Sequence, residues 1–275
     1  MRPSEVLRRA TTYLERHGVE SPRETAEVLL ASVLRTDRAG LYSRSEGLDH
    51  VEARTFGRAL CRRCAGAPVQ HLTGRQGFRG LDLAVRPGVF VPRPETEVLV
   101  EAALAMVWQP EPVVVDVGTG TGAVALSIAA ERPDATVYAT DVSAEAVILA
   151  RENASRLGLE VEVLEGDLLT PVPPGVAGRV DLVVSNPPYV REDDREPLPR
   201  EVLADPPLAL FGGTRVHERL AREAPRWLRP RGALVMEIGE TQAEEVTSLL
   251  AERYRDLRVL PDLAGRDRIV TGRLR

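Results

Sequence analysis

The chain has 275 residues, 43% of them hydrophobic and 28% charged. This composition is ordinary for a globular protein and argues against collagen-like, coiled-coil and disordered chains. All 36 basic residues are Arg, which excludes a catalytic lysine, a P-loop lysine and a Schiff base. Residues 1–70 hold 12 Arg and 9 acids (+3), and residues 71–275 hold 24 Arg and 32 acids (−8). The net charge of −5 argues against a general nucleic-acid binder, and its uneven spread predicts a basic arm on an acidic body.

Residues 1–66 are predicted to form short helices. Ser4 is a candidate cap for a helix that runs to Arg16. A capping box is expected at Ser21–Glu24, with proline at the first helical position. Another helix is expected to follow Asp49 and to end near Gly66. Together these segments predict a helical bundle.

The hydrophobic period then changes. Over residues 75–91, apolar residues are interrupted by Gly and Pro, which predicts a β-hairpin that bridges two domains. A helix is expected to begin around Glu95. From Pro112 onward, predicted strands and helices alternate, which indicates an α/β fold with a doubly wound parallel sheet.

The expected strands are Val113–Val117, Ala135–Thr140, Val161–Glu165, Val180–Ser185, Ala233–Ile238, Leu257–Leu260 and Arg268–Thr271. The last two are expected to form an antiparallel pair. The expected helices are Gly122–Glu131, Ala144–Leu157, Val216–Leu228 and Gln242–Arg253, the last one capped by Thr241.

A glycine-rich loop follows the first strand of this sheet. Backbone that turns sharply between a strand and a helix and approaches a ligand closely favours glycine. The G-x-G-x-G spacing differs from the G-x-x-G ending of the dinucleotide fingerprint, which disfavours a dehydrogenase. Asp116, just before the loop, suits a cationic amino-acid tail better than a pyrophosphate. The predicted cofactor-binding residues here are Asp116, Gly118, Thr119, Gly120, Thr121 and Gly122.

Two further strand ends carry carboxylates. Asp141 ends the second strand, where a carboxylate accepts hydrogen bonds from ribose hydroxyls. Asp167 follows the third strand and is predicted to meet an exocyclic adenine amine, with Leu168 packed on the ring. These three strand ends together predict a nucleoside-containing cofactor.

The fourth strand leads into Asn186, Pro187, Pro188 and Tyr189. An amide or aromatic amine nitrogen is a weak nucleophile because its lone pair is delocalised, so orientation helps more than a base does. The side-chain oxygen of Asn186 and the carbonyl oxygen of Pro187 can both accept from one NH2 group. The prolines make the turn rigid, and Tyr189 offers a π face to the planar substrate. Asn186 is expected to border the cofactor as well.

With these motifs, the chain resembles the N5-glutamine methyltransferases of peptide-chain release factors (the HemK/PrmC family) along essentially its whole length. The resemblance is carried by Gln70–Gly74, Phe78–Gly80, Val91–Glu97, the glycine loop, Asn186–Tyr189 and Asp262–Arg268. It implies S-adenosylmethionine as cofactor and the glutamine of the release-factor GGQ loop as methyl acceptor. It also implies a Rossmann-like, seven-stranded class I methyltransferase domain behind a small helical domain.

The domains predicted in this way are a helical substrate-recognition domain at 1–70, a β-hairpin linker at 71–91 and a methyltransferase domain at 92–275. Arg93, Glu95 and Thr96 resemble the family's stretch at the pocket mouth, although a helix start explains them equally well. One departure is visible after the Asn186 loop. The family usually has Glu-Pro and later Asp-Gly, and this chain has Asp205-Pro206 and Thr214-Arg215.

Other functions are disfavoured. An N6-adenine DNA or RNA methyltransferase also fits the Asn186 loop, but such enzymes need a recognition domain and base flipping, and only 86 residues follow Tyr189. The intact loop argues against a non-catalytic cofactor-binding module. Cys61 and Cys64 have zinc-knuckle or redox spacing but lie in a predicted helix, so helical packing is favoured. None of the four scattered histidines is predicted to be a ligand or base, and no metal is expected.

The predicted partner is a peptide-chain release factor. The protein is expected to be a monomer and to bind no nucleic acid directly. No secretory signal or apolar run of membrane-spanning length is visible. The two cysteines suit a reducing compartment, so a cytoplasmic location is expected.

Overall fold

The structure is a computed structural model, and it describes residues 1–196 and 198–275. The chain forms two compact units. One comprises Met1–Arg75 and Leu198–Ala204, and the other comprises Gln76–Pro197 and Asp205–Arg275. The smaller unit therefore takes up a short segment that follows the Asn186–Tyr189 loop in the sequence.

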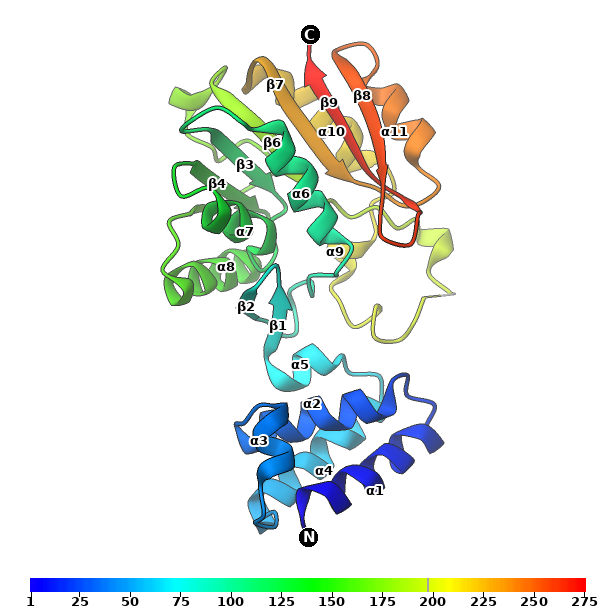
Figure 1. The fold of residues 1–275 in the computed structure, drawn as a ribbon. Coiled ribbons are helices and arrows are strands. Elements are labelled where there is room, and N and C mark those ends of the chain that lie inside the picture. Colours follow the sequence, from blue (N-terminus) through cyan, green and yellow to red (C-terminus); the bar gives the residue numbers. More distant parts are fainter. Residues whose placement is uncertain (197) are drawn as a thin grey trace. The chain divides into compact units, whose positions relative to one another are not determined.

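The larger unit is built on a seven-stranded sheet in the order β5-β4-β3-β6-β7-β9-β8 (Figure 1). Its first five members are parallel, and β9 pairs antiparallel with β7 and with β8. This confirms the predicted α/β class and the antiparallel end. The strands are β3 (Val113–Val117), β4 (Thr136–Asp141), β5 (Glu162–Glu165), β6 (Val180–Ser185), β7 (Leu228–Glu237), β8 (Tyr254–Pro261) and β9 (Asp267–Leu274).

Helices cover both faces of the sheet (Figure 1). One face packs against α6 (Thr96–Met106), α7 (Ala123–Glu131) and α8 (Ala144–Leu157). The other packs against α10 (Arg215–Glu223) and α11 (Ala243–Leu250). Burial on both faces explains why β3 and β6 have apolar runs without polar alternation.

The remaining elements of this unit are short. They are the hairpin β1 (Arg75–Phe78) and β2 (Leu81–Ala84), the helix α9 (Pro207–Leu210) and three 3₁₀ turns at Pro174–Val176, Glu192–Asp194 and Ala224–Arg226. Phe78 and Leu83 from the hairpin are buried in the same cluster as α6, α7 and α8. The hairpin is shorter than predicted, because β2 ends at Ala84 and 85–91 form no strand.

The smaller unit contains five helices within the described residues. They are α1 (Pro3–Arg16), α2 (Pro22–Leu34), α3 (Arg38–Ser43), α4 (His50–Cys64) and α5 (Val69–Thr73). Leu14, Leu30 and Phe56 are buried in its core. The short helices α3 and α5 were not expected, because neither is long enough to show a helical period. Arg63 on α4 donates to Glu201 at 2.8 Å and ties the segment Leu198–Ala204 to this unit.

Three predicted helix caps are wrong. Ser4 lies inside α1, whose cap position is Arg2. Ser21 does precede α2, but its backbone is left-handed (φ 45°) and its hydroxyl makes no capping bond, since a side-chain cap needs an extended residue there. Thr241 is not the cap residue of α11, which is Gln242. The capping box of this unit is at α4 instead, where Asp49 and Glu52 bond each other's backbone N–H groups.

Several element boundaries also differ from the prediction. The helix predicted to reach Leu228 ends at Glu223, and a 3₁₀ turn containing Pro225 follows, because proline cannot continue the helical hydrogen-bond ladder. β7 therefore begins at Leu228 rather than at Ala233. Among the described residues, no helix has the length and hydrophobicity that crossing a membrane requires.

Candidate active site

Four parallel strands end at the same edge of the sheet. Val117, the last residue of β3, pairs with Thr140 on β4 and with Ser185, the last residue of β6. Asp141 pairs with Glu165, the last residue of β5. The residues that follow these strands therefore meet at the carboxyl edge, where open α/β sheets bind ligands.

The glycine loop lies next to Asn186 and opens outward. Gly118, Gly120 and Gly122 have φ values of 73°, 57° and 86°, in the region that residues with a Cβ rarely adopt. A Cβ on Gly118 would lie 4.0 Å from the Asn186 carbonyl oxygen, and one on Gly120 would meet nothing within 4 Å. One on Gly122 would lie 2.9 Å from Leu126. Two of these glycines thus border open space and the third packs against the interior.

Asp116 braces this loop from within. Its Oδ2 accepts from the Thr119 hydroxyl at 2.6 Å and from the Ala125 N–H at 3.2 Å. The residue is 1% exposed, and this burial raises the pKa of Asp116 to about 7. The structure gives this carboxylate a role in holding the loop, and its predicted contact with a cationic tail remains a prediction.

Asp141 holds the outer part of the loop. Its Oδ2 accepts from the Gly120 N–H and its Oδ1 from the Ser143 N–H, both at 2.9 Å. Burial raises the pKa of this carboxyl group, and the backbone hydrogen bonds act against that rise. Each carboxylate oxygen has more than one lone pair, so a ribose hydroxyl can still donate to Asp141.

The residues after β5 have other contacts. Asp167 forms a bidentate ion pair with Arg219, with N···O distances of 2.7 and 3.1 Å. Leu168 is buried and packs with Leu169 and Val172 on the face covered by α10 and α11. An adenine amine would share Asp167 with Arg219, and the roles of Asp167 and Leu168 toward the base remain predictions.

These residues fit a nucleoside cofactor with an amino-acid tail. The loop offers open space beside Gly120, the Asp141 carboxylate at the end of β4 and a neighbouring strand end that leads to Asn186. The Thr140 hydroxyl, next to Asp141, is buried without a hydrogen-bond partner. A polar cradle with an unpaired hydroxyl is what a hydroxyl-rich ligand would complete.

A hydrogen-bond chain that the sequence did not reveal orients Asn186. The Asn186 Nδ2 donates to the Thr96 hydroxyl at 3.1 Å. The Thr96 hydroxyl also lies near the carboxyl group of Glu237 and lowers the pKa of that group. An ionised carboxylate only accepts, so a charged Glu237 favours the orientation in which the Thr96 hydroxyl hydrogen points toward it. This orientation agrees with Thr96 accepting from Asn186, and the Asn186 Oδ1 makes no hydrogen bond within the described residues.

Glu237 also holds Tyr189. The Tyr189 hydroxyl donates to Glu237 Oε1 at 3.3 Å, and Glu237 Oε2 is buried without a partner. Burial raises the pKa of Glu237 to about 7 and raises the pKa of Tyr189. The nearby positive charge of Arg268 lowers the pKa of Glu237 in part. The only signal of Glu237 in the sequence was its place as an acid at the end of an apolar strand.

Behind Glu237 lies a buried histidine. The Nε2 of His217 is 2.8 Å from the Glu237 carbonyl oxygen. Burial lowers the pKa of His217, which favours a neutral ring that donates from Nε2. Its Nδ1 is buried without a hydrogen-bond partner. This histidine supports the strand end and has no direct path to a reacting group.

The Asn186–Tyr189 loop is wedged against Gly212. A Cβ on Gly212 would stand 2.2 Å from the Pro188 carbonyl oxygen. The Gln242 Nε2 also donates to the Tyr189 carbonyl oxygen at 2.8 Å. Gly212, which lies between the two departures from the family pattern at Asp205-Pro206 and Thr214-Arg215, therefore shapes the loop.

We expect Gly212→Ala to push the Asn186–Tyr189 loop out of place. A Cβ at 2.2 Å must displace backbone, so the free energy of unfolding should fall by about 1–3 kcal/mol and methyl transfer should slow. Thermal unfolding and initial rates measure both effects, and Gly57→Ala, with nothing within 4 Å of the added Cβ, is the control. Unchanged rates in Gly212→Ala would show that the loop adapts.

Arg93 and Asp205 form an ion pair beside the site. The Asp205 side chain is fully buried and also accepts from the Val91 N–H at 3.1 Å. Asp205 thus keeps the charge of the family's usual glutamate and uses it to join two segments. Glu95 is exposed and immediately precedes α6. Thr96 both begins α6 and bonds Asn186, so the helix-start interpretation and the site interpretation hold together at that residue.

The remaining candidates lie outside this constellation. Cys61 and Cys64 are free thiols on α4, in the helix where packing was expected. Within 1–196 and 198–275, no three His, Cys, Asp or Glu side chains form a group that could hold a metal ion.

The chain is similar to known proteins in both sequence and fold. Residues 5–74 match the PrmC N-terminal domain family, and residues 81–205 match the methyltransferase small domain family. The structure is similar to that of a methyltransferase from Pyrococcus furiosus, with a TM-score of 0.53 and 21% identity over 71% of this chain and 89% of that chain. At this identity the likeness shows the fold alone.

Curated relatives are closer in sequence. The release factor glutamine methyltransferase of Koribacter versatilis is 42% identical over 96% of this chain and 95% of its own length. The one from Moorella thermoacetica is 44% identical over the same shares of both chains. Identity at this level along nearly the whole length, with a matching N-terminal domain, shows that the chain belongs to the family of release factor glutamine methyltransferases.

Proposed function

We propose that this protein transfers a methyl group from S-adenosylmethionine to the side-chain amide nitrogen (N5) of the glutamine in the GGQ motif of peptide-chain release factors. The observation that carries the proposal is the placement of Asn186 beside the glycine loop, with its amide nitrogen engaged by Thr96 and its amide oxygen free. The names of the relatives supply the class of substrate.

The chain's own groups supply orientation. Asn186 Oδ1 and the Pro187 carbonyl oxygen accept from the two N–H groups of the glutamine amide and turn its nitrogen toward the glycine loop. Tyr189, fixed through Glu237, lies against the flat amide. The bound cofactor supplies an electrophilic methyl group, and the nitrogen can lose a proton after it is alkylated. No residue has to act as a base before attack.

The cofactor is proposed to lie along the carboxyl edge of the sheet. Gly118–Gly122 would border its amino-acid part, Asp141 would accept from ribose, and Asp167 and Leu168 would border adenine. Asp116 supports the loop from beneath. Arg93 and Glu95 are proposed to border the entry of the substrate loop.

Residues 1–70 are proposed to recognise the protein substrate. A glutamine side chain alone offers too few contacts for discrimination, so specificity should come from surface beyond the pocket. The +3 charge of this part suits acidic patches on a partner. The compact unit to which it belongs also contains Leu198–Ala204, a segment that follows the Asn186–Tyr189 loop in the sequence after residues 190–197.

The test is methyl transfer from labelled S-adenosylmethionine to a purified release factor and to oligonucleotides, followed by peptide mass mapping. We expect label on the GGQ glutamine and none on a release factor whose GGQ glutamine is replaced by glutamate. Label on an adenine amine instead would assign the site to nucleic-acid methylation.

We expect Asp141→Ala to weaken cofactor binding with a smaller effect on turnover at saturation. Losing a charge-assisted hydrogen bond to ribose should cost about 1.5–3 kcal/mol of binding free energy. Calorimetric titration measures it. Because Asp141 also holds the Gly120 N–H, Asp141→Asn is the matched control, since it keeps an acceptor for the loop without the charge. An unchanged dissociation constant in Asp141→Ala would place ribose elsewhere.

A further inference from the structure

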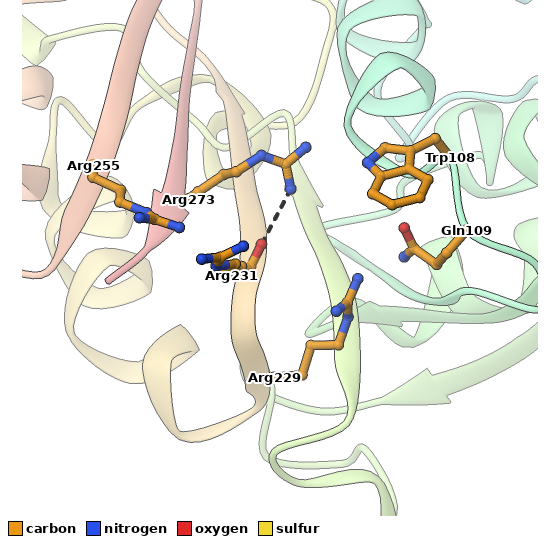
Figure 2. Close-up of a pocket in the computed structure, with 6 residues that line it drawn as sticks. All are labelled: Trp108, Gln109, Arg229, Arg231, Arg255 and Arg273. Carbon is orange, nitrogen blue, oxygen red and sulfur yellow. Dashed lines mark hydrogen bonds between the residues drawn. The ribbon is translucent and has the colours of Figure 1, made fainter.

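A pocket lies at the edge of the sheet opposite to the edge that carries Asn186. It has a volume of about 510 Å³, and Figure 2 shows its lining residues, which are Trp108, Gln109, Arg229, Arg231, Arg255 and Arg273. Arg229 is the second residue of β7, whose last residue is Glu237. Arg273 is on β9 and Arg255 is on β8. The two residues lie opposite each other in the antiparallel pairing of these strands. The proposed methyl-transfer chemistry does not use this pocket.

Two of the four arginines that line the pocket form ion pairs with acids and two do not, so the pocket keeps a net positive charge within the described residues. Arg229 forms an ion pair with Asp181, and Arg255 forms one with Asp256, with its Nε 3.8 Å from a carboxylate oxygen. The Arg255 Nε is buried without a hydrogen-bond partner.

Within the described residues, the guanidinium groups of Arg273 and Arg231 have no acidic partner. Arg273 donates only to the carbonyl oxygens of Arg231 and Met106, both at 3.1 Å. Arg231 has no ion pair within the described chain. Guanidinium groups without an acidic partner that line one pocket fit the oxygens of a phosphate group.

The other wall of the pocket suits a flat heterocycle. The indole of Trp108 is 80% exposed, and Figure 2 shows it next to Gln109 and across from Arg273. Both polar atoms of the Gln109 side-chain amide are buried without a hydrogen-bond partner. A buried amide with an unpaired donor and acceptor is costly. The edge of a nucleobase satisfies such an amide, and an indole is a stacking platform for the base.

We propose that this pocket binds a nucleotide unit, with its phosphate on Arg231, Arg255 and Arg273 and its base between Trp108 and Gln109. An acidic peptide would use the charges but would leave the Gln109 amide and the indole without a planar partner. The net negative charge of the chain does not argue against nucleotide binding at this pocket, because the ligand would contact the arginines that line it. The unit is either a free nucleotide or one nucleotide of a single strand, and the two differ in how binding depends on length.

The test uses the intrinsic fluorescence of Trp108. The chain has two tryptophans, and Trp227→Phe leaves Trp108 as the only one. Saturating S-adenosylhomocysteine keeps adenosine groups out of the proposed cofactor site. The probes are adenosine 5′-monophosphate and a six-nucleotide oligoadenylate, and inorganic pyrophosphate is the probe that lacks a base.

We expect saturable quenching by at least one of the two adenine probes and none by pyrophosphate. If the monophosphate quenches as tightly as the oligomer, the ligand is a free nucleotide. If only the oligomer quenches, the ligand is a strand, and the logarithm of its affinity should fall with the logarithm of salt concentration by about 0.7 per phosphate contacted.

Matched variants complete the test. Arg231→Gln combined with Arg273→Gln should weaken binding about ten-fold or more, since each removes a charge-assisted contact. Arg222→Gln, at an exposed arginine on α10, should leave binding unchanged, and all variants should keep methyl-transfer activity. Absence of quenching with both adenine probes, equal quenching by pyrophosphate, or unaltered affinity in a double variant that retains activity would each overturn the proposal.

Discussion

Asn186→Ala should lower kcat for methyl transfer by about 10²–10³, with little change in cofactor affinity. The expected size follows from other preorganised acceptors and donors, whose removal from a dry site costs that much in rate. Only the orientation of the acceptor amide is lost, because the glycine loop and Asp141 are anchored to each other without Asn186. Single-turnover rates and calorimetric titration of the cofactor measure the two effects separately.

Asn186→Asp is the informative companion. It keeps the size and one acceptor oxygen but removes the Nδ2 donor to Thr96. We therefore expect it to retain more activity than Asn186→Ala. Loss of cofactor binding in parallel with rate in Asn186→Ala would show that this residue is mainly part of the cofactor site.

The site was predictable where it lies on strand ends. Val113–Val117 and Val180–Ser185 were predicted with the bounds that the structure has, because strands buried on both faces have continuous apolar runs. The register of those two strands then places the glycine loop and Asn186 together. A local pattern and one rule about parallel sheets were enough for this part.

The supporting network was not predictable in the same way. Glu237 lies 51 residues after Asn186 in the sequence, and only the order of β6 and β7 in the sheet makes them neighbours. The wedge between Gly212 and Pro188 depends on backbone contact between distant loops. The predictions of helix caps at Ser4 and Ser21 were wrong, because capping depends on backbone dihedral angles as well as on residue type.

Glu237→Gln should remove a pH-dependent loss of stability. Burial raises the pKa of Glu237 from its ordinary 4.5 to about 7. The folded state therefore holds this proton more tightly than the unfolded state, and the resulting stability is fully present below pH 4.5 and is lost as pH rises through 7. A shift of this size corresponds to about 3 kcal/mol. Glutamine stays neutral, so the variant should gain about that much relative to the parent between pH 4.5 and pH 8.

Urea unfolding at several pH values measures this difference. Asp116 also has a raised pKa, but it is present in both proteins, so its contribution cancels. Glu165→Gln is the control, because Glu165 ends β5 as an exposed residue. A constant difference between Glu237→Gln and the parent across this pH range would mean that Glu237 is ionised normally in the folded protein.

The same variant should also change the rate of methyl transfer. Ionised Glu237 near Thr96 only accepts, which favours the arrangement in which Thr96 accepts from Asn186 and the Asn186 Oδ1 faces the substrate. Glutamine can also donate, so this direction is no longer enforced. We expect a loss of about ten-fold in kcat, the value of one orienting hydrogen bond of about 1.4 kcal/mol. The parent's kcat should rise with pH through about 7, as Glu237 ionises, and that rise should be absent in Glu237→Gln. If both proteins kept the same pH profile, Glu237 would support the fold without controlling the orientation of Asn186.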